Sequence, residues 1–410
     1  MGGGAGPRYR AAVDPASDDR RDDAVGWTVP GVLPHQELLR AIDEKIVQAT
    51  PPIPRANVQP ASIDLRLGKT AYRLRCSFLP DKESVTAKAA EYSLEEIDLT
   101  AGAILEPERP YLIPLLERID LPDTMRGRTN PKSSTGRVDV FTRVITDRNH
   151  RFDDIPAGYK GRLYLEVVSR TFAVRVQTGM ALNQLRLAVG DTAVSDVDLV
   201  AKHGERPVIV DAHDQKIPEG RLTVADGLFL TLDLEGDPDG VVGYRARRNS
   251  RLLDLTRIGA HRVRDFWDPV YREEDAPRLV LEPEDFYLLI SSEAVRIPPE
   301  YASEMSAYAE SSGELRSHYA GFFDPGFGHD PAKVLRGSRA VLEVRAHDVP
   351  FMVEQDQPVC KLTYERMSAA PQILYGKDTG SNYQGQVVML SKHFERDHSF
   401  DGQLSLLDGI

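Results

Sequence analysis

The chain has 410 residues, of which 41% are hydrophobic and 28% charged, and its formal net charge is −12. This length suits two globular domains, each large enough to bury a core, and no apolar run is long enough to cross a bilayer. The negative charge argues against a broad surface for nucleic-acid backbones, although it leaves room for a local basic pocket that binds one nucleotide. The two cysteines, Cys76 and Cys360, are too few for a disulfide framework or a cysteine-rich zinc site.

Residues 1–28 are rich in Gly, Arg and Asp and lack apolar periodicity, which predicts a disordered leader without a secretory signal. We therefore expect a cytoplasmic protein that does not associate with membranes. The clearest helical pattern spans residues 36–46, where four aliphatic side chains fall on one face. Most other patterns are short alternating runs broken by Gly, Pro and Asp, such as 62–67, 162–168 and 340–345. The sequence thus predicts a mainly β protein with few short helices, built as a sandwich, jelly roll or distorted barrel.

The chain also repeats itself. The sequence Leu-Glu-Pro-Glu at 105–108 recurs at 281–284, and at the same offset the segment 119–122 aligns with 295–298. The Leu-Glu-Val sequence at 165–167 recurs at 342–344. These matches indicate two tandem copies of one domain. We place the first domain at 29–197, a polar linker at 198–220 and the second domain at 221–410.

A loop in the first copy has the composition of an anion-binding site. Its sequence from 130 to 137 is Asn-Pro-Lys-Ser-Ser-Thr-Gly-Arg, which combines two cations and three hydroxyl groups around a glycine. Such groups match the oxygens of a phosphate chain, although an ordinary solvated turn has a similar composition. The corresponding segment of the second copy, 310–316, begins with Glu310 in place of Lys132. A carboxylate there would repel a triphosphate, so we expect the first copy to supply the working loop.

A glutamate in a strand-like apolar run is the candidate proton carrier. Glu166 occupies this position in the first copy and Glu343 in the second. The alternative is a strand residue that faces solvent, but a buried carboxylate has a raised pKa and can shuttle protons. The sequence lacks the ligand motif of zinc deaminases, a Gly-x-x-x-x-Gly-Lys-[Ser/Thr] phosphate loop and a Gly-x-Ser-x-Gly elbow. Chemistry that depends on zinc is therefore not expected.

Five segments, taken in their order and spacing, resemble the dCTP deaminase family, a branch of the trimeric dUTPase-like β fold, in its double-length bacterial form. They lie at 59–68, 132–137, 158–166, 179–185 and 375–385. The resemblance implies two tandem dUTPase-like domains, each a distorted β-barrel or jelly roll. It also implies hydrolysis of dCTP to dUTP and ammonia without zinc, as a step toward thymidylate synthesis.

The resemblance assigns roles to individual residues. Glu166 is expected to be the general acid/base, Ser133 to hold the attacking water, and Arg137 to stabilise charge or orient the carboxylate. Mg²⁺ is expected to be bound through the triphosphate, and a tail near the C-terminus to cover the nucleotide. The substrate-binding residues that the resemblance implies are Lys132, Ser134, Thr135, Gly136, Asp154, Gln184, Tyr375, Lys377, Tyr383 and Gln384.

Several alternatives stay open at this point. The base pocket would fall at 144–147, where Thr146 and Asp147 depart from the family's usual small residues, so the preference for cytosine over uracil is not fixed. Asp154 is our choice for the sugar, but Asp324 lies in a cleaner Asp-Pro-Gly motif, and Glu343 or Asp324 could complete a site shared between domains. A dUTPase, a bifunctional deaminase and diphosphatase, and a non-catalytic nucleotide-binding double domain are the alternative functions. The resemblance also implies a homo-oligomer, trimeric or differently closed, and dTTP as an inhibitor.

Overall fold

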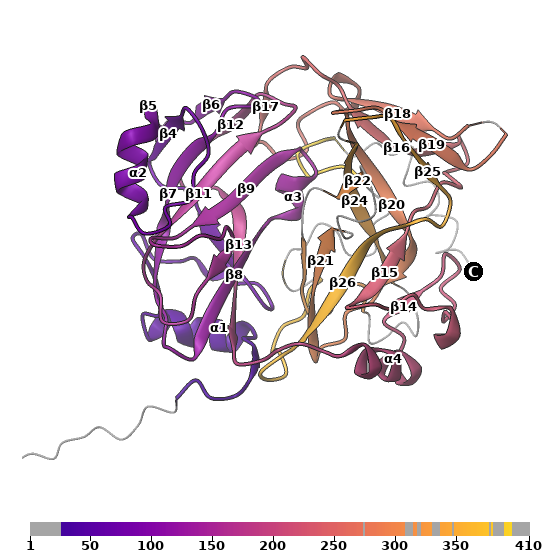
Figure 1. The fold of residues 1–410 in the computed structure, drawn as a ribbon, viewed down its shortest axis with the longest axis horizontal. Helices are drawn as coiled ribbons and strands as arrows, with labels where there is room; N and C mark the ends of the chain where they lie inside the picture. The colour runs from indigo at the N-terminus through magenta and orange to yellow at the C-terminus, as the bar shows by residue number, and fades with distance from the viewer. Residues whose placement is uncertain are drawn as a thin grey trace, which may run out of the picture.

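The computed structural model describes residues 26–273, 275–307, 315–317, 321–329, 337–346, 348–376, 379 and 389–395. It is mainly β, as predicted, and the first and second halves of the chain lie side by side (Figure 1). None of the helices in these ranges is long and apolar enough to cross a membrane. Four α-helices occur in the described ranges: α1 (His35–Asp43), α2 (Val85–Tyr92), α3 (Ser133–Gly136) and α4 (Asp196–Glu205).

Two sheets form the first domain. One has the order β5-β4-β7-β11-β9, with β2 also paired to β7, and the other has the order β1-β13-β8-β10, with β3 paired to β13. The first sheet comprises β2 (Val47–Ala49), β4 (Thr70–Leu74), β5 (Ser93–Asp98), β7 (Tyr111–Asp120), β9 (Val140–Ile145) and β11 (Lys160–Ser169). The second comprises β1 (Gly31–Val32), β3 (Ile63–Arg66), β8 (Met125–Pro131), β10 (Asp154–Ile155) and β13 (Ala181–Val189). The predicted strands at 62–67 and 162–168 correspond to β3 and β11.

The second domain also contains two sheets, with a similar arrangement of strands. Its sheets have the orders β18-β16-β20-β24-β22, with β14 on β20, and β15-β26-β21-β23. The strands of the first sheet are β14 (Ile209–Val210), β16 (Val241–Ala246), β18 (Trp267–Tyr271), β20 (Phe286–Val295), β22 (Leu315–Ser317) and β24 (Ser338–Ala346). Those of the second are β15 (Leu228–Thr231), β21 (Tyr301–Ala307), β23 (Gly321–Phe323) and β26 (Pro358–Arg366). The two copies share their register, because Glu166 pairs with Leu112 and Glu343 pairs with Leu288 at the corresponding place.

Smaller sheets complete the structure. In one of them β17 (Leu253–Asp254) of the second half pairs in parallel with β12 (Val174–Val176), which also pairs with β6 (Ala103–Leu105). The other joins β19 (Arg278–Leu281) and β25 (Phe351–Glu354). The two halves are therefore linked by backbone pairing as well as by side-chain packing.

The segment expected as a linker has regular structure. Residues 198–220 include most of α4, β14 and the start of a 3₁₀ turn at Glu219–Arg221, and β14 pairs with β20 of the second domain. Ser195 accepts a hydrogen bond from the backbone N–H of Asp198, at 3.1 Å, and so caps α4. Leu199 and His203 of α4 are buried, which gives the helix one buried face. The polar composition of this stretch concealed a helix that packs on the second domain.

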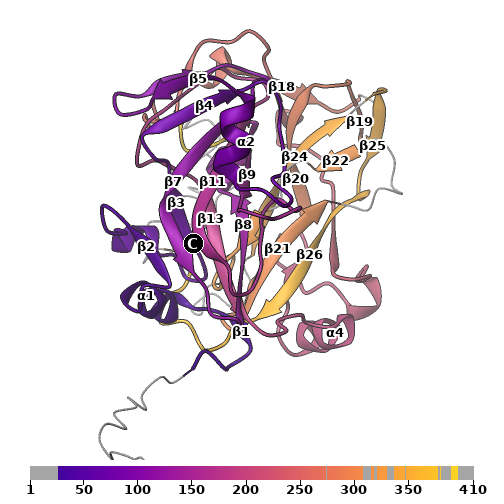
Figure 2. The ribbon, with the colours of Figure 1, turned by 60° about the vertical axis from the view of Figure 1, so that its left-hand side comes forward.

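The helix predicted at 36–46 is present as α1, three residues shorter at its C-terminal end. Leu38 and Ala41 are buried, as an amphipathic surface helix requires. The main core spans both halves and contains an aromatic group in which the Trp267 ring lies 5.5 Å from the Phe172 ring. Figure 2 shows the two halves side by side, and this core includes buried side chains from both of them.

Candidate active site

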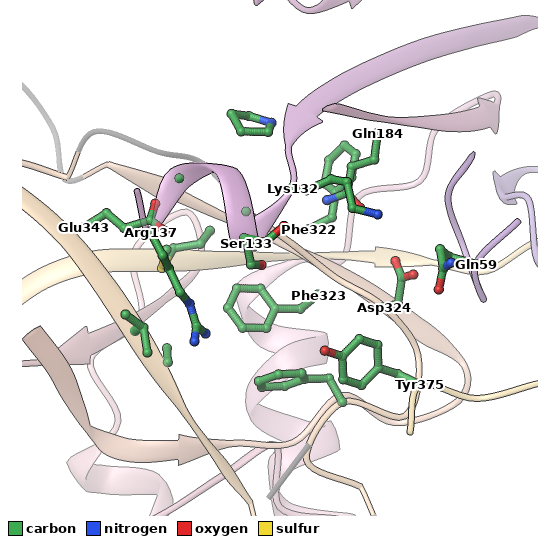
Figure 3. Close-up of a pocket in the computed structure, with 18 of the residues that line it drawn as sticks. Gln59, Lys132, Ser133, Arg137, Gln184, Phe322, Phe323, Asp324, Glu343 and Tyr375 are labelled. Carbon is green, nitrogen blue, oxygen red and sulfur yellow. The ribbon is translucent and has the colours of Figure 1, made fainter. Parts of the chain in front are cut away.

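A cleft between the two halves contains most of the predicted loop (Figure 3). From the first domain it is lined by Gln59, Asp64, Pro131, Lys132, Ser133, Ser134, Gly136, Arg137 and Gln184. From the second half it is lined by Met305, Gly321, Phe322, Phe323, Asp324, Phe327, Arg339, Ala340, Val341, Glu343, Tyr375, Thr379 and Lys392. Both halves of the chain thus contribute to one cleft.

The loop follows β8 and contains the short helix α3. The carbonyl oxygen of Lys132 accepts hydrogen bonds from the backbone N–H groups of Thr135, at 2.7 Å, and Gly136, at 3.0 Å. This turn leaves Ser133 exposed toward the cleft and buries the Thr135 side chain behind it. The ammonium group of Lys132 forms an ion pair with Asp64 of β3. The loop therefore presents its cation and a hydroxyl group on a fixed backbone.

The carboxyl group of Glu343 reaches the loop from β24 of the second domain. Its side chain is buried, and this burial raises the pKa of Glu343 to about 8. The charge of Arg137 opposes the rise in pKa, whereas the charge of Asp139 adds to it. A Cβ atom on Gly136 would lie 2.5 Å from Oε2 of Glu343, so the glycine leaves room for this carboxyl group. The raised pKa favours the protonated carboxylic acid at neutral pH. Figure 3 shows this carboxyl group beside α3, whereas the guanidinium group of Arg137 points to another part of the cleft.

Asp324 follows β23 and lies at another part of the cleft (Figure 3). Its carboxylate accepts a hydrogen bond from Nη2 of Arg186, at 3.2 Å, and one from Oγ of Ser62, at 3.4 Å. Arg186 belongs to β13 of the first domain and is almost fully buried, with its guanidinium carbon 3.9 Å from the Phe322 ring centre. Burial raises the pKa of Asp324, and the charge of Arg186 opposes that rise. A first-domain arginine therefore orients a second-domain carboxylate.

Aromatic side chains form a wall near Asp324. The Phe323 and Phe327 rings are 4.9 Å apart, and the Phe327 and Tyr375 rings are 5.4 Å apart. The backbone N–H of Tyr375 donates to the carbonyl oxygen of Pro325 at 2.8 Å. Gly326 has a φ of +97°, and a Cβ there would lie 2.7 Å from Cβ of Leu374, so only glycine permits this close approach.

Glu166 lies outside the cleft. It is buried in β11, does not line the cleft, and accepts hydrogen bonds from Nε of Arg143, at 3.2 Å, and from Nη2 of the same residue. The Arg143 guanidinium in turn lies 3.7 Å from the centre of the Phe152 ring. The structure therefore brings Glu343, and not Glu166, to the loop at 132–137.

Asp154 and the predicted base pocket are also outside the cleft. The side chain of Asp154 is half exposed and lies 3.5 Å from Arg151. Asp147 accepts a hydrogen bond from the backbone N–H of Val85 at 2.7 Å and so caps α2. Strand β10 pairs with β8 in the first copy, and β23 pairs with β21 in the second copy. Ile155 and Phe323 occupy corresponding places in these pairings, so the next residue, Pro156, is the first-copy counterpart of Asp324. Thus the first copy lacks the carboxylate at this position, and the second copy lacks the lysine of the loop.

The other predicted residues divide into three groups. Lys132, Ser133, Ser134, Gly136, Arg137, Gln184 and Tyr375 line the cleft. Thr135 is buried, and its backbone N–H donates to the carbonyl oxygen of Lys132, so it stabilises the loop without lining the cleft. Lys377, Tyr383 and Gln384 lie outside the described residues.

Several residues that line or support the cleft were not predicted from the sequence. Asp64 lies in the 59–68 motif that carried the resemblance, so a signal for it was present. Phe322 and Phe323 directly precede the Asp-Pro-Gly motif that begins at Asp324. Arg186 and Lys392 stood in no pattern, because their positions depend on how the two halves pack. In the described part of the chain, no three His, Cys, Asp or Glu side chains are grouped as metal ligands.

Fold and cleft together define a two-domain β protein in which a loop of cationic and hydroxyl side chains lies opposite a buried carboxyl group. The family model "2'-deoxycytidine 5'-triphosphate deaminase (DCD) N-terminal domain" matches residues 29–191, and the corresponding C-terminal model matches residues 195–394. The chain belongs to the dCTP deaminase family.

Individual relatives agree with this assignment. A crystal structure of 2'-deoxycytidine 5'-triphosphate deaminase from Agrobacterium tumefaciens is 40% identical, covers 84% of this chain and 100% of its own, and has a TM-score of 0.78. A dUMP-forming dCTP deaminase of Sulfurihydrogenibium sp. is 27% identical over 38% of this chain and 83% of its own length. The dCTP deaminase of Actinobacillus pleuropneumoniae serotype 5b is 29% identical over 32% of this chain and 68% of its own.

Proposed function

We propose that this chain hydrolyses dCTP to dUTP and ammonia in the cleft between its two halves. The first copy supplies the loop at 132–137, and the second copy supplies Glu343 and Asp324. The observation that carries the proposal is the buried carboxyl group of Glu343, which lies against Gly136 in the same cleft as Lys132. Membership in the dCTP deaminase family supports the choice of substrate.

Glu343 moves the protons in this proposal. Its raised pKa keeps it protonated at neutral pH, so it can donate a proton to N3 of the cytosine ring. A water molecule then attacks C4, and the Glu343 carboxylate takes a proton from that water. Glu343 passes this proton to the amino nitrogen and accepts the remaining hydroxyl proton as the C4–N bond breaks. Ammonia leaves, the water oxygen becomes the carbonyl oxygen of uracil, and Glu343 is again protonated.

The other residues bind and orient. Ser133 holds the attacking water, and Arg137 stabilises negative charge on Glu343 and on the oxygen bound to C4. Lys132, with the backbone of the loop, binds the triphosphate, which brings Mg²⁺ as part of the substrate. Asp324, kept in place by Arg186, accepts a hydrogen bond from a sugar hydroxyl, and the aromatic wall packs against the nucleoside.

Ammonia release from dCTP with Mg²⁺ tests the proposal. We expect Glu343→Gln to lower kcat by about 10²–10⁴-fold, because the amide cannot carry a proton. Glu166→Gln is the matched control, since it makes the same change at the equivalent position of the first copy. The assignment would be wrong if Glu343→Gln kept the wild-type rate while Glu166→Gln lost it.

A dUMP-forming reaction is the second candidate, because two of the relatives have that name. Product analysis with dCTP and with dUTP separates the two: dUMP and pyrophosphate indicate the bifunctional reaction, whereas dUTP indicates deamination alone. The cytoplasmic location, the homo-oligomer and inhibition by dTTP stay predictions.

A further inference from the structure

A segment near the C-terminus, 389–395, contacts the loop of the first domain. Oγ of Ser391 donates a hydrogen bond to the carbonyl oxygen of Ser134 at 2.9 Å. The carbonyl oxygen of Met389 accepts one from Nη1 of Arg137 at 3.4 Å. Lys392 directly follows these two anchors and lines the cleft.

The segment is fixed on its other side by the shared aromatic core. The Phe394 ring is buried and lies 5.5 Å from the Phe266 ring and 6.0 Å from the Trp267 ring. The carbonyl oxygen of Lys392 itself accepts a hydrogen bond from the backbone N–H of Gly259 at 3.0 Å. The backbone of Lys392 is thus held by the loop, by the core and by its own hydrogen bond.

Lys392 shares its surroundings with the lysine of the loop. Both line the same cleft as Asp64, and Asp64 is ion-paired with Lys132. Burial lowers the pKa of Lys392, and the charge of Lys132 lowers it further, while the charge of Asp64 opposes this change. The ammonium groups of Lys132 and Lys392 therefore act on each other and share the influence of the Asp64 carboxylate.

We propose that Lys392 is a second phosphate-binding lysine, which contacts the triphosphate together with Lys132. The proposal rests on the proposed deamination of dCTP and names a residue that holds its substrate. A triphosphate brings several negative charges, which offset the repulsion between the two ammonium groups. A lysine suits this role because its ammonium group is a compact charge with three rotatable donors.

The test compares Lys392→Ala and Lys392→Gln with wild-type protein in the ammonia-release assay. We expect both variants to raise KM for dCTP by about 10–100-fold, as loss of a charged hydrogen bond does, with kcat changed by less than about 3-fold. Lys392→Arg is expected to recover part of the affinity. Inhibition by dCMP, which has one phosphate, is expected to weaken far less than binding of dCTP.

Lys361→Ala is the matched control, because Lys361 is also half buried but lies on β26 outside the cleft. It is expected to leave KM unchanged, and thermal melts show whether each variant is folded. An unchanged KM for dCTP in folded Lys392→Gln protein would overturn the proposal, as would equal weakening of dCTP and dCMP. Neither result would contradict the proposed deaminase activity. That proposal fails only if wild-type protein releases no ammonia from dCTP.

Discussion

Replacing Glu343 with glutamine is expected to stabilise the fold at alkaline pH while it strongly lowers kcat for deamination. In the folded protein the pKa of Glu343 is about 8, whereas its ordinary value is 4.5. Between these values the folded protein keeps the proton and the unfolded chain loses it. The free energy of unfolding therefore falls as pH rises through this window, and the contribution of protonated Glu343 is lost above about pH 8. The glutamine side chain has no proton to lose, so the Glu343→Gln variant lacks this decline.

The magnitude follows from the same pKa. The difference between 4.5 and about 8, at about 1.4 kcal/mol per pH unit, gives an upper bound of about 5 kcal/mol for the loss of stability. Relaxation and water entry reduce this value, so we expect a change of several kcal/mol between about pH 5 and pH 9. Urea denaturation followed by circular dichroism across this range measures it for both proteins.

Glu293→Gln is the control for this experiment. Glu293 is also a carboxyl group whose pKa is raised by burial, but Thr231 donates two hydrogen bonds to it and it does not line the cleft. We expect this variant to keep full deaminase activity. The reasoning would be refuted if wild type and Glu343→Gln lost stability in parallel as pH rises.

Three further predictions concern the cleft and the first-copy glutamate. Gly136→Ala should lower kcat by about 10²-fold, because its Cβ would displace the Glu343 carboxyl group; a full rate in the ammonia assay would contradict this. Arg186→Gln removes the charge that lowers the pKa of Asp324, so Asp324 should stay protonated to a higher pH and the KM of this variant for dCTP should fall as pH rises. Arg186→Lys should restore the wild-type pH profile of KM, and a defect independent of pH would indicate a purely structural role. Glu166→Gln should lower Tm by several degrees through loss of the ion pair with Arg143, yet keep kcat; loss of kcat with no change in Tm would point to a catalytic role.

Much of the architecture was open to prediction from local patterns. Short apolar or alternating runs identified β3, β11 and β24, and the periodic segment at 36–46 identified α1. The loop at 132–137 was recognisable because cations, hydroxyl groups and glycine are close together in sequence. The helix α4 was missed, since its polar sequence conceals a single buried face formed by Leu199 and His203.

The choice between the two glutamates needed tertiary structure. Glu166 and Glu343 occupy equivalent places in equivalent strands, so nothing local distinguishes them. The deciding fact is that the first-domain loop packs against β24, which no spacing within one copy reveals. A hint did exist in the sequence, because the copy with the intact loop has Pro156 where the other copy has Asp324.

The covalent joining of the two complementary halves has a consequence for enzyme concentration. A site formed between separate subunits is lost when the subunits dissociate on dilution. Here the loop and Glu343 belong to the same polypeptide, so their effective concentration does not depend on the enzyme concentration. Specific activity from this cleft should therefore stay constant down to nanomolar enzyme. By the same reasoning each 45.6 kDa chain should bind one equivalent of nucleotide here, however many chains associate.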